Sequence, residues 1–105
     1  MNLSEVYSFL DELWFDNDMF FCWGCGSSIA IEHHHIISRQ EMSKIGKKHL
    51  LTDPENIIPL CHDCHHNKWH DGTIKQKKEL RCLDVILDYY EKEAPELYEL
   101  LKQKL

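Results

Sequence analysis

Two short stretches decide the fold of this chain: Cys22-Trp23-Gly24-Cys25, and Cys61-His62-Asp63-Cys64-His65-His66-Asn67-Lys68-Trp69-His70. Each contains a Cys-x-x-Cys pair, and all eight histidines lie between Cys22 and His70 inclusive. Two such pairs can close a tetrahedral zinc site with four thiolates, which leaves no open position for chemistry. We therefore expect one structural zinc at Cys22, Cys25, Cys61 and Cys64, and a separate role for the histidines.

Length and composition are those of a small folded protein. A chain of 105 residues buries a limited fraction of its surface, so a structural metal would add stability that the core alone does not supply. Apolar residues make up 43% and charged residues 29%, which argues against disorder. No apolar run approaches the roughly 20 residues of a membrane span, and the N-terminus lacks the features of a signal peptide. We expect a single cytoplasmic domain, residues 1–105, with no membrane partner.

The charge is unevenly distributed along the chain. A net charge of −6 disfavours nucleic-acid binding, because phosphate contacts need Lys and Arg. Residues 39–81, however, contain nine cations and six acids, a local balance of +3, so the rest of the chain carries −9. This basic centre is consistent either with ordinary solvated surface or with phosphate contacts, for which the candidates are Arg39, Lys44, Lys47 and Lys48.

Periodicity divides the chain into three segments. Residues 1–19 predict a helix over residues 4–16, with Ser4 as its N-cap. Residues 20–72 predict a strand entering a knuckle at 20–26, strands at 29–37 and 56–60, a long loop at 38–55 and a helix beginning near His65. Residues 73–105 predict helices over about 75–93 and from Pro95 onwards, with Cys82 buried as a small apolar residue. The strand, loop, strand, helix order is a ββα unit, so we predict a small α+β fold flanked by terminal helices.

The segment over roughly residues 20–72 resembles the HNH family of metal-dependent nucleases. Three stretches carry the resemblance in the family's order: Glu32-His33-His34-His35-Ile36-Ile37-Ser38-Arg39, then Asp53-Pro54-Glu55-Asn56-Ile57-Ile58-Pro59-Leu60-Cys61, then Cys64-His65. The resemblance is closest to small nucleases of phages and bacteria. It implies a ββα-metal (His-Me finger) centre, a structural zinc, one catalytic divalent metal such as Mg²⁺, and DNA as the partner, in a bacterial or phage-infected cell.

The same resemblance implies catalytic roles by position. His35, directly before the Ile-Ile pair, matches the general base, and His34 matches a metal ligand. Asn56 matches the residue that holds the loop and orients the base, and His65 matches the second metal ligand. A histidine with a pKa of about 6.5 can activate a water, while a divalent cation neutralises phosphate charge. Because neighbours on a regular strand point to opposite faces, we expect the strand to end or distort at His34 and His35.

The histidines after the last knuckle cysteine leave the ligand set open. His70 lies five positions after His65 and four after His66. Residues i and i+4 share a face of an α-helix, which favours His66 with His70, whereas the family position favours His65. We predict His65 and His70 as ligands, with His66 as the alternative to His65. The remaining histidines are expected to face solvent or support the ligands (His33, His62) or to lie in the loop near phosphate (His49).

The sequence as a whole predicts a DNA endonuclease that hydrolyses phosphodiester bonds. The alternative is a non-catalytic, zinc-stabilised module that binds nucleic acid or protein. A zinc deaminase would need His-x-Glu upstream of Pro-Cys-x-x-Cys, but Leu60 separates Pro59 from Cys61. The sequence leaves open a protein partner, a homodimer through the acidic helices, the choice of catalytic metal, and nicking as against double-strand cleavage.

Overall fold

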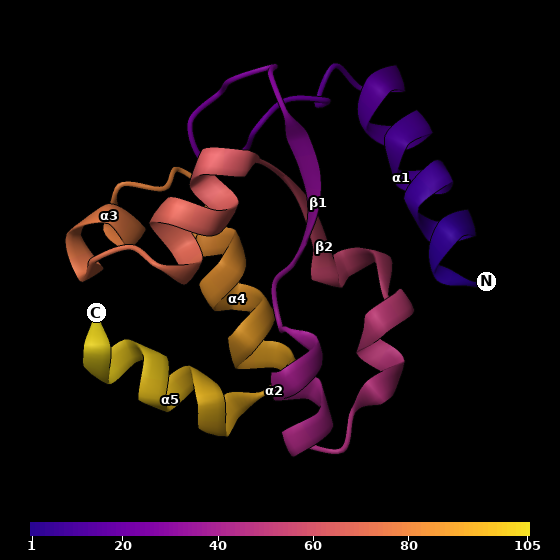
Figure 1. Cartoon of the computed structure of the whole chain (residues 1–105). Coiled ribbons are helices and arrows are strands. Elements are labelled where there is room, and N and C mark those ends of the chain that lie inside the picture. The colour runs from indigo at the N-terminus through magenta and orange to yellow at the C-terminus, as the bar shows by residue number, and fades with distance from the viewer.

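The structure, a computed structural model, describes residues 1–105. It is a mixed fold in which a two-stranded antiparallel sheet lies among helices (Figure 1). The elements in chain order are α1 (Leu3–Asp16), β1 (Ile31–His35), α2 (Arg39–Lys44), the 3₁₀ helices η1 (Lys48–Thr52) and η2 (Pro54–Asn56), β2 (Ile57–Cys61), the π-helix η3 (Asp63–His70), α3 (Ile74–Lys78), α4 (Leu83–Glu93) and α5 (Pro95–Lys104). The predicted class, a small α+β protein with a ββα unit, is confirmed.

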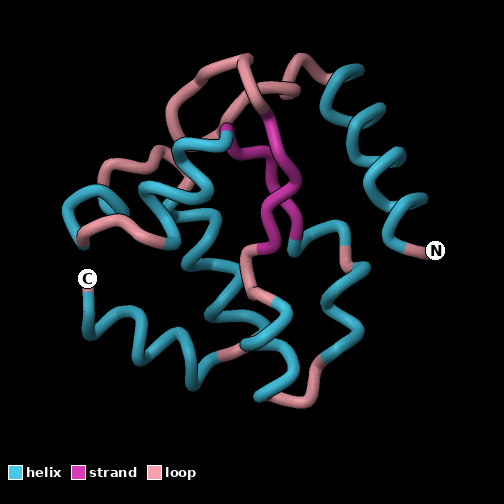
Figure 2. The backbone as a smooth tube through the Cα atoms, viewed as in Figure 1, coloured by secondary structure: helices cyan, strands magenta, loops and turns pink.

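The sheet brings the two ends of the metal-binding segment together. Ile31 on β1 lies opposite Cys61 on β2, and His35 lies opposite Ile57. Both strands occupy the centre of the molecule, with helical segments around them (Figure 2). Every residue of β2 is buried, whereas on β1 only His34 is. Both strands differ from prediction: β1 spans five residues and is shorter than the predicted 29–37, whereas β2 keeps the predicted length but begins one residue later, because Asn56 belongs to η2.

The start of the chain departs from prediction in two details. Asn2, and not Ser4, caps α1: its side chain accepts from the Glu5 N–H (2.9 Å), and its own N–H donates to the Glu5 carboxylate (3.2 Å). The predicted strand before the knuckle is absent. No strand lies beside residues 20–21 to pair with them, and one backbone bond, from Trp23 N–H to the Pro59 carbonyl (3.0 Å), ties this segment to β2.

The predicted loop over residues 38–55 contains helices instead. Ser38 caps α2 by accepting from the Glu41 N–H (3.1 Å), and the Glu41 carboxylate accepts from the Ser38 N–H (3.1 Å). This Ser-x-x-Glu capping box is a signal that the sequence contained. Gly46 and Pro54 suggested a loop. Gly46 lies between α2 and η1, and Pro54 is the first residue of η2, where proline is tolerated.

The helix predicted over residues 75–93 is two helices, α3 and α4. Residues 79–82 interrupt it, because the Arg81 N–H donates to the Gly24 carbonyl (3.1 Å) and so joins the chain to the first knuckle. Leu80 and Cys82 are each 3% exposed, and burial of both at this break outweighs helical periodicity. The predicted burial of Cys82 is confirmed, as is the helix that begins at Pro95.

The core has two parts. The larger surrounds β2, η3 and α4 and includes the knuckle cysteines; the smaller joins one face of α1 to β2 through Val6, Leu10, Trp14 and Ile57. The termini lie at the periphery (Figure 1). None of the helices combines the length and the apolar character that crossing a membrane requires.

Candidate metal centre and active site

The four knuckle cysteines converge. Their sulfur atoms all lie within 4.8 Å of one another, and the Cys25 and Cys61 sulfurs are 3.7 Å apart. Zn–S bonds of about 2.3 Å at tetrahedral angles place sulfurs about 3.8 Å apart, so the cluster fits zinc. The Gly24 and Cys64 amides donate to the Cys22 (3.3 Å) and Cys61 (3.4 Å) sulfurs. Four cysteines at this spacing could bind zinc, as the sequence predicted.

The pKa values of the clustered cysteines also favour metal binding. Burial raises the pKa of Cys22, but hydrogen bonds from Cys61, Cys25 and Gly24 outweigh it and lower that pKa to about 7. Burial and the neighbouring thiols raise the pKa of Cys64. The Cys22 thiolate therefore forms readily, whereas the raised pKa values of Cys61 and Cys64 favour their protonated thiols unless a cation takes the protons' place. The donor set is that of a structural zinc site.

A second cluster of ligands lies where β1 meets η3. Nitrogen atoms of His34, His65 and His70 all lie within 4.8 Å of one another. His34 is fully buried, and neither of its ring nitrogens has a hydrogen-bond partner. An unsatisfied buried polar side chain costs on the order of 1–3 kcal/mol, which a metal–nitrogen bond would offset. Burial, and then the neighbouring histidines, hold the pKa of His34 well below its usual value, so the ring is neutral and able to ligate.

The π-helix decides which histidines converge. Residues five apart on an α-helix point about 140° away from each other, which would separate His65 from His70. In η3 the hydrogen bonds run from residue i+5 to residue i, as from the Asp71 N–H to the His66 carbonyl (3.0 Å), and residues five apart share a face. The structure therefore brings His65 to His34 and His70. His66, the alternative, lies instead against Glu32.

Glu32 is a residue of this site that sequence reasoning missed. Its carboxylate accepts hydrogen bonds from three histidines: His62 Nδ1 (2.8 Å), His65 Nδ1 (2.8 Å) and His66 Nε2 (3.0 Å). The bond from His62, followed by those from His65 and His66, lowers the pKa of Glu32 to about 2, although burial opposes the shift. The signal was its position two residues before His34, on the same face of β1.

The hydrogen bond from His65 to Glu32 selects the tautomer of the ring. With Nδ1 donating to the carboxylate, Nε2 carries the lone pair and can bind a cation. Carboxylate–histidine pairs of this kind commonly orient metal ligands. Burial lowers the pKa values of His65 and His70, which keeps both rings neutral near pH 7.

His35 is the last residue of β1. The strand therefore ends at His34 and His35, as expected from the sequence. The Nε2–H of His35 donates to the Leu51 carbonyl oxygen (2.9 Å). Because a carbonyl only accepts, Nε2 holds the proton and Nδ1 keeps a lone pair. Burial lowers the pKa of His35, partly opposed by the bond to Leu51, so the ring is unprotonated at neutral pH.

Asn56 is fully buried and bonds only to backbone. Its side-chain oxygen accepts from the Ile37 N–H (2.7 Å), and its amide donates to the carbonyls of Ile37 (3.1 Å) and Leu50 (3.1 Å). These bonds tie the segment after β1 to η1. Since Leu51 follows Leu50 directly, Asn56 holds in place the carbonyl that orients His35.

The four candidate DNA contacts fall into two pairs. Arg39 and Lys48 line one hollow of about 220 Å³ with Met42, Ser43 and Leu51, beside the carbonyl that receives His35. Lys44 and Lys47 line a different hollow together with Glu93 and Glu96. Lys47 donates to the Glu93 carbonyl, and its ammonium lies 3.7 Å from the Glu93 carboxylate. Of the two pairs, only the first is free of nearby acids in its hollow.

The other histidines lie outside the three-histidine cluster. His33 stacks on Tyr7 with ring centres 3.9 Å apart and donates to Asp11 (2.8 Å), so it joins β1 to α1. His62 is exposed and bonds to Glu32. His49 is exposed within η1.

Comparison with known proteins agrees with this geometry. A model of the HNH endonuclease family matches residues 14–74, which is more than half of the chain. The chain belongs to the HNH endonuclease family. The family is one of nucleases that use divalent metals, so membership implies a nucleic-acid substrate. No curated protein sequence and no solved structure shows a significant match.

Proposed function

We propose that this protein is a metal-dependent DNA endonuclease that hydrolyses phosphodiester bonds. The observation that carries the proposal is the convergence of His34, His65 and His70 next to His35, which is bonded to the Leu51 carbonyl while Asn56 holds the adjacent Leu50 carbonyl. Three imidazoles are a ligand set with room for other ligands, in contrast to the closed cysteine cluster. A binding module has no need for a buried histidine with two unsatisfied nitrogens.

His34, His65 and His70 would hold the catalytic divalent cation. The cation would neutralise charge on the phosphate and on the departing oxygen. Glu32 keeps His65 in the tautomer that presents Nε2 and fixes the orientation of its ring. Burial keeps all three rings neutral, so they do not repel a cation near pH 7.

His35 acts as the general base in this proposal. Its Nδ1 takes a proton from the attacking water, while Nε2–H remains bonded to the Leu51 carbonyl. That bond fixes the ring, and it stabilises the positive charge that the ring acquires. Asn56 does not touch the reacting atoms; it is a positioning residue, because it holds the backbone on either side of the base.

The test is cleavage of supercoiled plasmid by the purified protein with Mg²⁺, Mn²⁺, Co²⁺, Ni²⁺ or Zn²⁺ added singly. We expect cleavage with at least one ion, and for His35→Ala a loss of roughly 100-fold to 10,000-fold in rate with DNA affinity unchanged. Gln103→Ala, at an exposed position of α5, is the control. Cleavage by His35→Ala at the parent rate would refute the base, and no cleavage with any ion would favour the binding module.

A further inference from the structure

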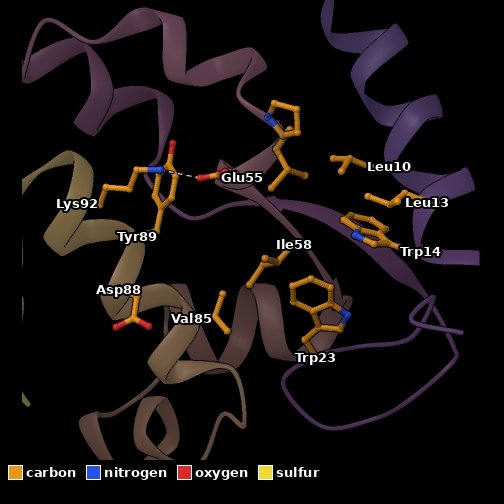
Figure 3. Close-up of a pocket in the computed structure, with 12 residues that line it drawn as sticks. Leu10, Leu13, Trp14, Trp23, Glu55, Ile58, Val85, Asp88, Tyr89 and Lys92 are labelled. Carbon is orange, nitrogen blue, oxygen red and sulfur yellow. Dashed lines mark hydrogen bonds and ion pairs between the residues drawn. The ribbon is translucent and has the colours of Figure 1, made fainter. Parts of the chain in front are cut away.

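A hollow of about 460 Å³ lies between α1 and α4, over the start of β2 (Figure 3). Eight of its twelve lining residues are apolar. Those that shape it are Leu10, Leu13 and Trp14 from α1, Trp23 and Ile58 beneath, and Val85 from α4. We call it the α1/α4 groove. None of the four knuckle cysteines lines it, and neither do His34, His35, His65 or His70.

Apolar side chains remain in contact with solvent along this groove. Leu13 is 43% exposed and Val85 is 39% exposed, one on each wall. Phe9, one turn before Leu13 on α1, is also 46% exposed, although it does not line the groove. Contiguous apolar surface of this kind on a small protein commonly marks a binding site for another macromolecule. Both walls present residues at i, i+3 and i+4, the spacing with which helices pack on one another.

The charge around the groove narrows the choice of occupant. α1 carries four acids and no cation, and α4 carries four acids and one cation, Lys92. The charged residues that line the groove itself are Glu55, Asp88 and Lys92, and Lys92 donates to Glu55 (2.9 Å), so the negative charge comes from Asp88 and from the other acids of the two helices. DNA would be repelled here. A second copy of the chain would set acidic helices against acidic helices, and this disfavours a homodimer through the groove.

We propose that the α1/α4 groove binds an amphipathic helix of a partner protein, with an apolar stripe that enters the hollow and Lys or Arg on both flanks. The apolar lining of the groove and the excess of acids on α1 and α4 match that chemistry on both counts. Because the groove shares no residue with the histidine cluster, the partner and a substrate can be bound at once. The inference does not depend on the chain being a nuclease.

The probe is a synthetic helical peptide of about 14 residues with Leu at i, i+3, i+4 and i+7 and Lys elsewhere. Binding is followed by the indole N–H resonances of Trp14 and Trp23, with Trp69 in η3 as the internal control. We expect saturable shifts of Trp14 and Trp23 with Trp69 unmoved. The same peptide with Glu in place of Lys should bind at least about tenfold more weakly.

Matched variants separate the groove from the rest of the surface. Leu13→Asn and Val85→Asn should each weaken binding about tenfold, whereas Leu100→Asn, 56% exposed on α5, should not. Asp88→Lys in the groove wall should weaken binding, and Glu99→Lys on α5 should not. Circular dichroism verifies that each variant is folded.

Three outcomes would overturn the proposal. The first is equal loss of affinity in the groove and α5 variants. The second is binding of the Glu peptide as tight as that of the Lys peptide. The third is a dimer in sedimentation that Leu13→Asn and Val85→Asn both convert to monomer, which would make a second copy of the chain the occupant.

Discussion

The four-cysteine cluster and the three-histidine cluster share one short turn of the chain, since Cys64 and His65 are consecutive. The cysteine cluster is closed: backbone amides point at its sulfurs, and all four tetrahedral positions are filled by protein. The histidine cluster offers three nitrogens, one of them on the buried His34 ring, and its outer member, His70, is exposed. Both clusters consist of side chains that bind divalent metals, and in the proposed function only the histidine cluster has a position left for a substrate.

The difference shows how a chain of this size can combine stability with chemistry. The cysteine cluster joins the first knuckle to the end of β2 and the start of η3, although Cys25 and Cys61 are 36 residues apart in sequence. That join determines where His65 lies relative to His34. In the proposed function, the cysteine cluster would affect catalysis only by positioning His65, whereas the histidine cluster and His35 would act on the substrate directly.

The largest expected effect is the loss of stability on replacing one cysteine of the four-cysteine cluster. Cys61→Ser should lose zinc and unfold, because a structural zinc is worth on the order of 10 kcal/mol and the whole protein about 5–15. The matched control is Cys82→Ser, another buried cysteine outside the cluster, which should keep its zinc and lose only about 1–3 kcal/mol. Zinc content and thermal unfolding are the measurements. A zinc-free Cys61→Ser protein as stable as the parent would contradict the structural role that distinguishes the cysteine cluster from the histidine cluster.

A smaller effect is expected at the edge of the open site. Glu32→Gln removes the charge that holds His65, so affinity for a divalent cation should fall about 10-fold to 100-fold while the structural zinc stays bound. Glu55→Gln, which breaks only the surface bond to Lys92, is the control. Calorimetric titration with Co²⁺ or Ni²⁺ gives both affinities. Unchanged affinity in Glu32→Gln would mean that the carboxylate does not support the ligands.

DNA binding should distinguish the two pairs of cations. In a His35→Ala background, changing Arg39 and Lys48 to Gln should reduce the log–log salt slope of DNA affinity by about two units, at about 0.9 per phosphate contact. Changing Lys44 and Lys47 to Gln should reduce it less, since Glu93 and Glu96 share their hollow. Equal slopes for both double variants would show that neither pair is a preferred phosphate contact.

The smallest effect is expected from removing a residue of η3. Deleting Asn67 makes the spacing from His65 to His70 four residues, which an ordinary α-helix can place on one face. Cation affinity should then stay within a few-fold of the parent. Deleting Asp84 in α4 should instead unfold the protein, because every later side chain in that helix turns by about 100°. Loss of cation binding on deletion of Asn67 would contradict the role given to the π-helix.

The sequence was informative wherever spacing alone decides geometry. Two Cys-x-x-Cys pairs predicted the cysteine cluster, and short runs of apolar and β-branched residues predicted the ββα order, because thiolate geometry and strand formation follow from local pattern. It was uninformative where long-range contacts override local preference. The break at residues 79–82 follows from the bond between Arg81 and Gly24, which no helical periodicity reveals.

The candidate site shows the same division. His34, His35 and Asn56 could be named from motif position. The choice between His65 and His66 could not, because an α-helix was the natural assumption and η3 is a π-helix. Glu32 was missed because its role depends on three histidines that come about 30 residues later and reach it only through the pairing of β1 with β2.

The most direct test of the difference between the two clusters is a chelation experiment on the zinc-loaded protein. EDTA is applied long enough to strip the weaker site, and plasmid cleavage, zinc content and circular dichroism are then measured before and after the divalent ion is restored. We predict that cleavage stops and returns with the ion, while one zinc per chain and the folded spectrum persist throughout. Cleavage that survives EDTA, or that is lost only together with the zinc and the fold, would contradict a structural cysteine site beside a separate catalytic histidine site.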